Sequence, residues 1–147
     1  MFKYRLERIL DLREQELDKV KTKFQEAIGY VNQIQNKITQ NKLDQTSTQK
    51  DMVTEKGLRS PQLYLNRLKH LKNQLEDLEQ DLEKAKSELE LVREELVQAQ
   101  QKAEVLRKHK DKKKDEFEKA EQKKEENEMN ELALIMKRHK EEQEKDD

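Results

Sequence analysis

Residues 64–106 read YLNRLKHLKNQLEDLEQDLEKAKSELELVREELVQAQQKAEVL, and the spacing of their apolar residues predicts a coiled coil. The apolar residues follow one another at alternating steps of four and three residues. They are Tyr64, Leu68, Leu71, Leu75, Leu78, Leu82, Ala85, Leu89, Val92, Leu96, Ala99, Ala103 and Leu106. A repeat of about 3.5 residues keeps one stripe of a helix facing a partner helix. We call this stripe the seam.

The same spacing occurs in the first part of the chain, so the partner helix is expected to lie within the chain itself. Its seam residues are Leu6, Leu10, Arg13, Leu17, Val20, Phe24, Ala27, Val31, Ile34 and Ile38. The second seam passes over Lys110 and Lys113 and resumes at Phe117 and Ala120. With 44% charged residues, disorder is the competing interpretation, but a disordered chain would not maintain this repeat.

Gly57, Ser60 and Pro61 interrupt the helical pattern between the two seams. Gly57 is expected in the left-handed conformation just past a helix end, with Leu58 packing back onto Val53. Ser60 suits the cap of the next helix. Pro61 suits its first position, where the missing N–H costs nothing.

We therefore predict an all-α fold in which two long helices form an antiparallel coiled-coil hairpin. The expected parts of this single domain, residues 1–147, are helix one at about 3–55, a turn at about 56–60, helix two at about 61–140, and a frayed tail at 141–147. Helix two is longer and should overhang at the C-terminus. In this register Glu7 meets Lys110 and Phe2 lies near Phe117.

At the turn end, the two predicted seams do not match in polarity. Helix one continues with Asn41, Gln45 and Thr48, whereas the facing part of helix two is rich in leucine. The facing apolar residues are Leu63, Tyr64, Leu65, Leu68, Leu71 and Leu75. Apolar surface without an intramolecular partner marks a contact for another molecule. Alternatively, Leu43 and Met52 cover it, or this end frays.

The overhang holds a second unmatched apolar cluster. Its members are Met129, Leu132, Ala133, Leu134, Ile135 and Met136. A solitary helix gains nothing from such a cluster in water, so a docking role is one interpretation, and a frayed, sticky terminus is the other.

The composition excludes several function classes. The net charge of −1 provides no large field for nucleic acid, and the chain has no Cys for disulfides or metal ligation. The histidines His70, His109 and His139 are too far apart to share a metal, and two glycines cannot build a phosphate-binding loop. We expect no enzyme activity, no cofactor and no metal. The basic run at 107–114 is expected to be a solvated face or a contact for an acidic protein surface.

No stretch of eighteen apolar residues is present, so we expect no direct membrane insertion. The first residues carry charges at every second or third position, unlike a signal peptide. These features favour a cytoplasmic protein.

The chain resembles the FliJ family of flagellar type III export proteins over nearly its whole length. The opening Phe2-Lys3-Tyr4-Arg5-Leu6 is similar to the family's alternating aromatic start. Tyr64, Asn66 and Leu68 match its Tyr-Gln-Gln-Phe-apolar segment, whereas Leu65 and Arg67 depart from it. The stretches 114–118 and 130–133 are similar to its C-terminal pattern.

The resemblance implies a non-catalytic stalk, like the coiled coil of the rotary ATPase γ subunit. Such a stalk binds the hexameric flagellar export ATPase, the cytoplasmic part of the export gate and export chaperones, at the periphery of the inner-membrane export apparatus. The expected gate-binding residues are Leu63, Tyr64, Leu68 and Leu71. The expected ring-binding residues are Phe2, Phe117, Met129, Leu132, Ile135 and Met136.

Two other function classes remain open at this point. One is a coiled-coil holdase of the prefoldin type, although the stretch around Gly57 is too short for the β-hairpin that such chains use. The other is a scaffold that dimerises without a specific machine.

Overall fold

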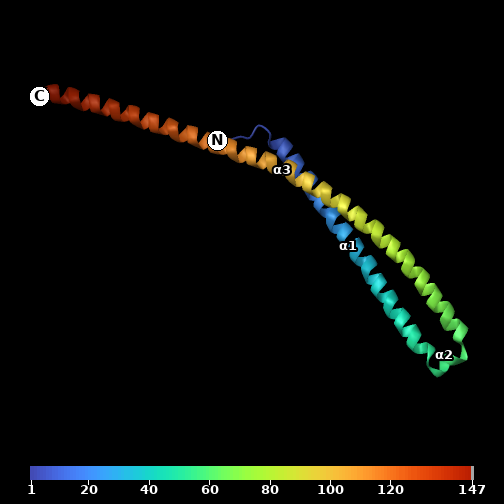
Figure 1. Ribbon diagram of the computed structural model, residues 1–147. Coiled ribbons are helices and arrows are strands. Elements are labelled where there is room, and N and C mark those ends of the chain that lie inside the picture. Colours follow the sequence, from blue (N-terminus) through green and yellow to red (C-terminus); the bar gives the residue numbers. More distant parts are fainter. Residues whose placement is uncertain (147) are drawn as a thin grey trace. The chain divides into compact units, whose positions relative to one another are not determined.

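The computed structural model describes residues 1–146, and nearly all of them are helical (Figure 1). The helices are α1 (Glu7–Met52), α2 (Glu55–Arg59) and α3 (Pro61–Asp146). Within these described residues there is no strand. The predicted all-α class and the pair of long helices that pack together are confirmed.

The helix boundaries differ from the prediction in specific places. α1 begins at Glu7 and ends at Met52, so it is shorter at both ends than the expected range of about 3–55. α3 begins at Pro61, as expected, and continues through Lys110 and Lys113 to Asp146. The predicted frayed tail is therefore helical over residues 141–146, and Asp147 lies outside the described residues.

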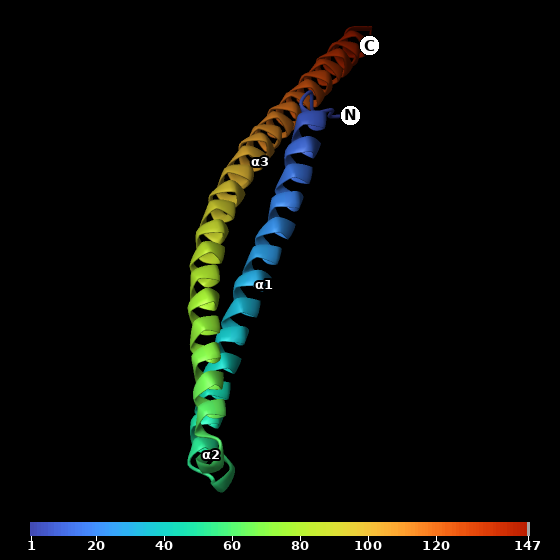
Figure 2. The ribbon, with the colours of Figure 1, turned by 90° about the vertical axis from the view of Figure 1, so that its right-hand side faces the viewer.

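The chain divides into two compact units. The tip unit contains residues 14–101, and the terminal unit contains residues 1–13 together with α3 from Lys102 onward. In the tip unit α1 and α3 run side by side, and α2 lies at the turn between them (Figures 1 and 2).

The seam forms the core of the tip unit. Every predicted seam residue from Leu17 to Ile38 and from Tyr64 to Ala99 is buried or half-buried. Its densest part is one apolar cluster, composed of Val31, Ile34, Ile38 and Ala85 with Leu75, Leu78, Leu82 and Leu89 packed against them. Burial at steps of three and four on both helices is what a coiled-coil seam requires.

The interhelical contacts of the tip unit define how the two helices pair. Lys23 Nζ lies 3.1 Å from Glu95 Oε2, and Asn41 Nδ2 lies 3.0 Å from the carbonyl oxygen of Leu71. Each of these contacts joins α1 to α3 within the tip unit.

The turn differs from the prediction, because residues 53–60 lie between α1 and α3 and Gly57 has a different role. No glycine in residues 1–146 has a positive φ, so the predicted left-handed Gly57 is wrong. Gly57 instead lies buried within α2, where an added Cβ would come 2.5 Å from Cα of Met52. Glycine is required here because the α2 backbone approaches the end of α1. Leu58 and Val53 are largely exposed, so Leu58 does not pack back as predicted.

Hydrogen bonds of the i to i+3 type close the end of α1. The amide of Val53 donates to the Lys50 carbonyl, and the amide of Thr54 donates to the Asp51 carbonyl at 3.1 Å. The Thr54 hydroxyl also donates to the Asp51 carbonyl. These bonds satisfy carbonyl groups that the helix leaves without an intrahelical partner, and they let the chain turn toward α2.

The terminal unit joins the first residues of the chain to α3. Leu10 and Ala103 are its buried apolar centre. The Lys110 ammonium lies 2.9 Å from Glu7 Oε2, and the rings of Phe2 and Phe117 have centroids 5.6 Å apart. Both predicted contacts are confirmed. The seam ends at Phe117, because Ala120 is exposed where the prediction placed it in the seam.

Candidate partner-binding surfaces

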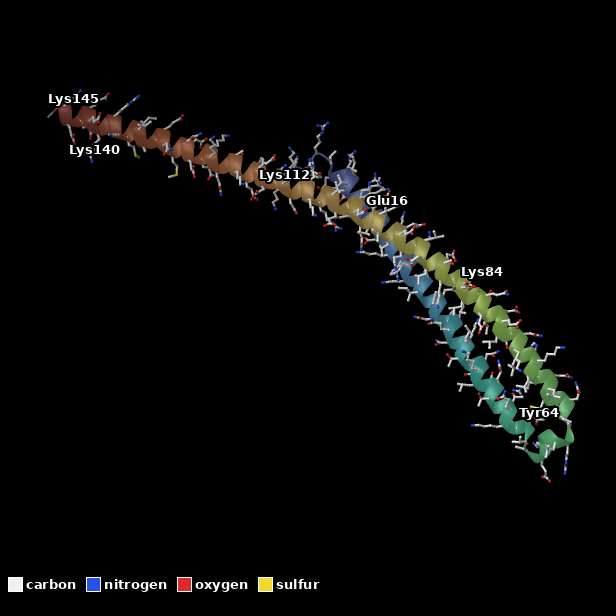
Figure 3. All side chains as sticks on the ribbon, in the orientation of Figure 1. Glu16, Tyr64, Lys84, Lys112, Lys140 and Lys145 are labelled. Carbon is white, nitrogen blue, oxygen red and sulfur yellow. The ribbon has the colours of Figure 1, made fainter. Side chains whose placement is uncertain are left out.

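The predicted gate-binding residues lie at the start of α3, near the turn, but they differ in accessibility. Leu63 is 68% exposed, and Tyr64 is half-buried in the first turns of the helix (Figure 3). Leu68 and Leu71 are only 9% and 8% exposed. The expectation that all these side chains lack an intramolecular partner is therefore wrong for Leu68 and Leu71.

A layer of polar side chains from α1, which we call the polar layer, replaces apolar residues in the seam opposite these leucines. It consists of Asn41, Gln45 and Thr48. Asn41 Nδ2 donates to the Leu71 carbonyl and to Gln74 Oε1 at 3.3 Å, and Asn41 Oδ1 accepts from Gln45 Nε2 at 2.7 Å. Because Asn41 is fully hydrogen-bonded, it can be buried without an unsatisfied polar atom.

The alternative that Leu43 and Met52 cover this part of α3 is only partly supported. Met52 is half-buried, but Leu43 is 59% exposed and faces solvent. The Thr48 side chain is buried, and its hydroxyl donates to the Asp44 carbonyl at 2.7 Å. The hydroxyl is satisfied within α1, which leaves the Thr48 methyl group for the seam.

The turn carries further exposed apolar side chains that the sequence analysis did not select as contact residues. They are Leu43, Val53, Leu58 and Leu65. Val53 and Leu58 were expected to pack on one another, but they are 78% and 72% exposed.

The terminal unit contains a groove between the first residues and α3. Its volume is about 830 Å³. It is lined by Met1, Phe2, Lys3, Tyr4, Arg5, Leu6, His109, Lys113, Glu116 and Phe117. Its lining combines aromatic rings with charged side chains, so this groove suits a partner segment with an apolar anchor.

Tyr4 holds the first residues against α3 in a way that was not predicted. Its hydroxyl makes a hydrogen bond of 2.6 Å with Nδ1 of His109, and the two ring centroids are 5.6 Å apart. The hydroxyl also lies 3.5 Å from the Leu106 carbonyl. The alternating aromatics Phe2 and Tyr4 were the available signal, because both pack on the same part of α3.

The predicted apolar cluster of the overhang is accessible. Every residue from 118 to 145 is exposed, and side chains project around this part of α3, which contains Lys140 and Lys145 (Figure 3). Met129, Leu132, Ile135 and Met136 are between 58% and 72% exposed. Met129, Leu132 and Met136 lie on one face of the helix, because they are three and four residues apart.

Three lysines of the basic run at 107–114 pair with carboxylates. Lys108 pairs with Glu104 at 3.2 Å, Lys110 with Glu7, and Lys113 with Glu116 at 3.4 Å. Such pairing weakens the positive field that a nucleic acid would require.

Residues 1–146 contain no cluster of three His, Asp or Glu side chains that could hold a metal ion. No helix in this range has both the length and the apolar character needed to cross a membrane.

A protein-family model described as "Flagellar FliJ protein" matches residues 2–142. No curated protein and no solved structure matches the chain. The matched range includes the leucine-rich start of α3, the groove and the apolar cluster of the overhang.

Proposed function

Because this chain belongs to the FliJ family of flagellar proteins and is thus related to flagellar export, we propose that it is a non-catalytic stalk. In this proposal the stalk binds the hexameric export ATPase through its terminal unit. It binds the cytoplasmic part of the export gate through its tip unit, and it also receives export chaperones. The stalk acts in the cytoplasm, peripherally at the inner-membrane export apparatus.

The proposed stalk is an antiparallel coiled-coil hairpin whose second helix overhangs. Pairing in the tip unit, where Lys23 contacts Glu95 and Asn41 contacts Leu71, supports this arrangement. Pairing in the terminal unit, where Phe2 contacts Phe117, supports it independently. The exposure of residues 118–145 supports the overhang.

We assign ATPase-ring binding to the terminal unit. The proposed contact residues are Phe2, Phe117, Met129, Leu132, Ile135 and Met136. The observation that carries the assignment is the exposed apolar cluster of the overhang, because large apolar side chains in a highly charged helix are costly unless a partner covers them.

We assign gate binding to the start of α3. Leu63 is exposed and Tyr64 is half-buried in the free protein, and Leu65 and Leu58 are further exposed apolar side chains near the turn. Leu68 and Leu71 also belong to the proposed contact, although they are buried in the free protein.

Matched variants of the two ends test this assignment. Leu132→Glu with Ile135→Glu alters only the overhang, and Leu63→Glu with Leu65→Glu alters only the turn end. All four side chains are exposed, so both variants should fold as the parent does. The first should lose binding to the purified ATPase hexamer and keep binding to the gate domain. The second should lose binding to the gate domain and keep binding to the ATPase hexamer. Loss of both kinds of binding in either variant would contradict the assignment of separate contact surfaces.

A further inference from the structure

The seam changes character within the tip unit. From Val31 to Ile38 the buried residues of α1 are apolar, and they pack in one cluster with Leu75–Leu89 of α3. Beyond Ile38 the buried positions of α1 are Asn41 and Thr48. The leucines at the start of α3 therefore lie against polar side chains.

This difference makes the section near the turn easier to open than the rest of the seam. Burial of apolar surface against apolar surface is the main stabilising term in such a seam, and the polar layer contributes little of it. Its hydrogen bonds replace bonds to water, so their net contribution is small. If α1 separates from α3 here, water can satisfy Asn41 and Gln45.

The surroundings of the polar layer allow such a movement. α1 ends at Met52, and the five-residue α2 is its only helical connection to α3. The apolar cluster around Ile34 and Ala85 lies on the other side of the polar layer, and it can hold the two helices together while the turn end opens.

Opening would uncover a continuous apolar stripe on α3. Tyr64, Leu68 and Leu71 are spaced by four and three residues, so they share one face of the helix. An amphipathic helix with anchors at these spacings fits an apolar groove on a partner.

We propose that residues 41–52 separate from α3 and thereby expose Tyr64, Leu68 and Leu71 to a helix-binding apolar groove in the cytoplasmic part of the export gate. The identification of the export gate as the partner rests on the proposed function, whereas the separation of residues 41–52 from α3 does not. The polar layer is then a device that keeps the gate-binding stripe covered until the partner is present.

Hydrogen exchange of the full chain tests the opening without any partner. The amides of residues 43–52 and 64–72 should exchange faster than those of residues 30–38 and 82–92. Fraying near a helix end would also produce this difference, so the variant Asn41→Leu with Thr48→Val is the control. It makes the seam apolar and should slow exchange at the turn end by about tenfold or more. Exchange that is unchanged in this variant would overturn the proposal.

Cross-linking tests whether the gate needs the open form. The chain has no cysteine, so Asn41→Cys with Gln74→Cys introduces two thiols where the side chains of α1 and α3 meet. A short bismaleimide linker then holds the section closed and leaves Tyr64, Leu68 and Leu71 intact. A second linked variant, Lys23→Cys with Glu95→Cys, joins the helices outside the proposed opening.

The linker at positions 41 and 74 should weaken binding of the gate domain at least tenfold relative to the same variant without linker. The linker at positions 23 and 95 should leave binding unchanged. Equal binding by both linked proteins would overturn the requirement for opening. If the parent chain does not bind the gate domain at all, the proposed gate contact fails, and the exchange experiment alone decides whether the section opens.

Discussion

The ammonium of Lys110 lies 3.0 Å from Oε1 and 2.9 Å from Oε2 of Glu7, more than one hundred residues away in the sequence. Lys110 occupies a seam position that would otherwise hold an apolar residue. A lysine at such a position is tolerated because the carboxylate lies opposite it, and the pair fixes the pairing of the first turn of α1 with α3.

A double-mutant cycle of Glu7→Gln and Lys110→Met measures this pair. Both side chains are more than one third exposed, so the coupling free energy should be modest, at about 0.5 to 1 kcal/mol. Urea unfolding followed by circular dichroism gives the four free energies. A coupling near zero would show that Glu7 and Lys110 do not select the register.

The two glycines should respond to alanine in opposite directions. Gly29 lies within α1 with no atom in reach of an added Cβ, so Gly29→Ala should stabilise the protein by about 0.5 to 1 kcal/mol. Gly57→Ala should destabilise it, because the new methyl group meets the backbone of Asp51 and Met52. Thermal unfolding compares both with the parent chain, and stabilisation by Gly57→Ala would contradict the close approach of α2 to α1.

Substitution by alanine should lower the free energy of unfolding more at a buried leucine than at an exposed one. Leu71→Ala removes a buried side chain and should cost about 2 kcal/mol of unfolding free energy. Leu63 lies eight residues earlier and is largely exposed, so Leu63→Ala should change the unfolding free energy by less than about 0.5 kcal/mol. Equal effects in urea unfolding would show that the seam does not extend to Leu71.

Removal of the overhang should affect binding and not folding. A chain that ends at Asn127 keeps Phe117 and the whole seam, and every residue removed, up to Lys145, is exposed. The unfolding temperature should remain within about 2 °C of that of the parent chain, whereas binding to the ATPase hexamer should be lost. A large decrease in unfolding temperature would reveal that the overhang contributes to the fold.

Much of the fold could be predicted because helix pairing is periodic. The alternating steps from Leu17 to Ile38 and from Tyr64 to Ala99 identify nearly every covered position of the tip unit. The contacts of Phe2 with Phe117 and of Glu7 with Lys110 followed from the same register. Pro61 marked the start of α3 because its ring suits a first helical position.

The turn and the polar layer could not be predicted in the same way. Gly57 suits both a left-handed backbone and a close approach, and only the path of α2 distinguishes the two. Asn41 and Thr48 were recognised as polar seam residues, but their burial depends on hydrogen bonds to Leu71 and Asp44, which periodicity does not reveal. For this reason periodicity places Leu68 and Leu71 in the seam but does not reveal which side chains cover them.

The most direct test of the stalk is a titration of the purified chain into the flagellar export ATPase from the same source, with ATP hydrolysis as the readout. We expect stimulation that saturates at one chain per six ATPase subunits, and no hydrolysis by the chain alone. The variant Leu132→Glu with Ile135→Glu should give no stimulation at any ratio. If the assembled ring shows no response to the parent chain at any ratio, the stalk proposal is contradicted, and the holdase and scaffold functions become the better explanations.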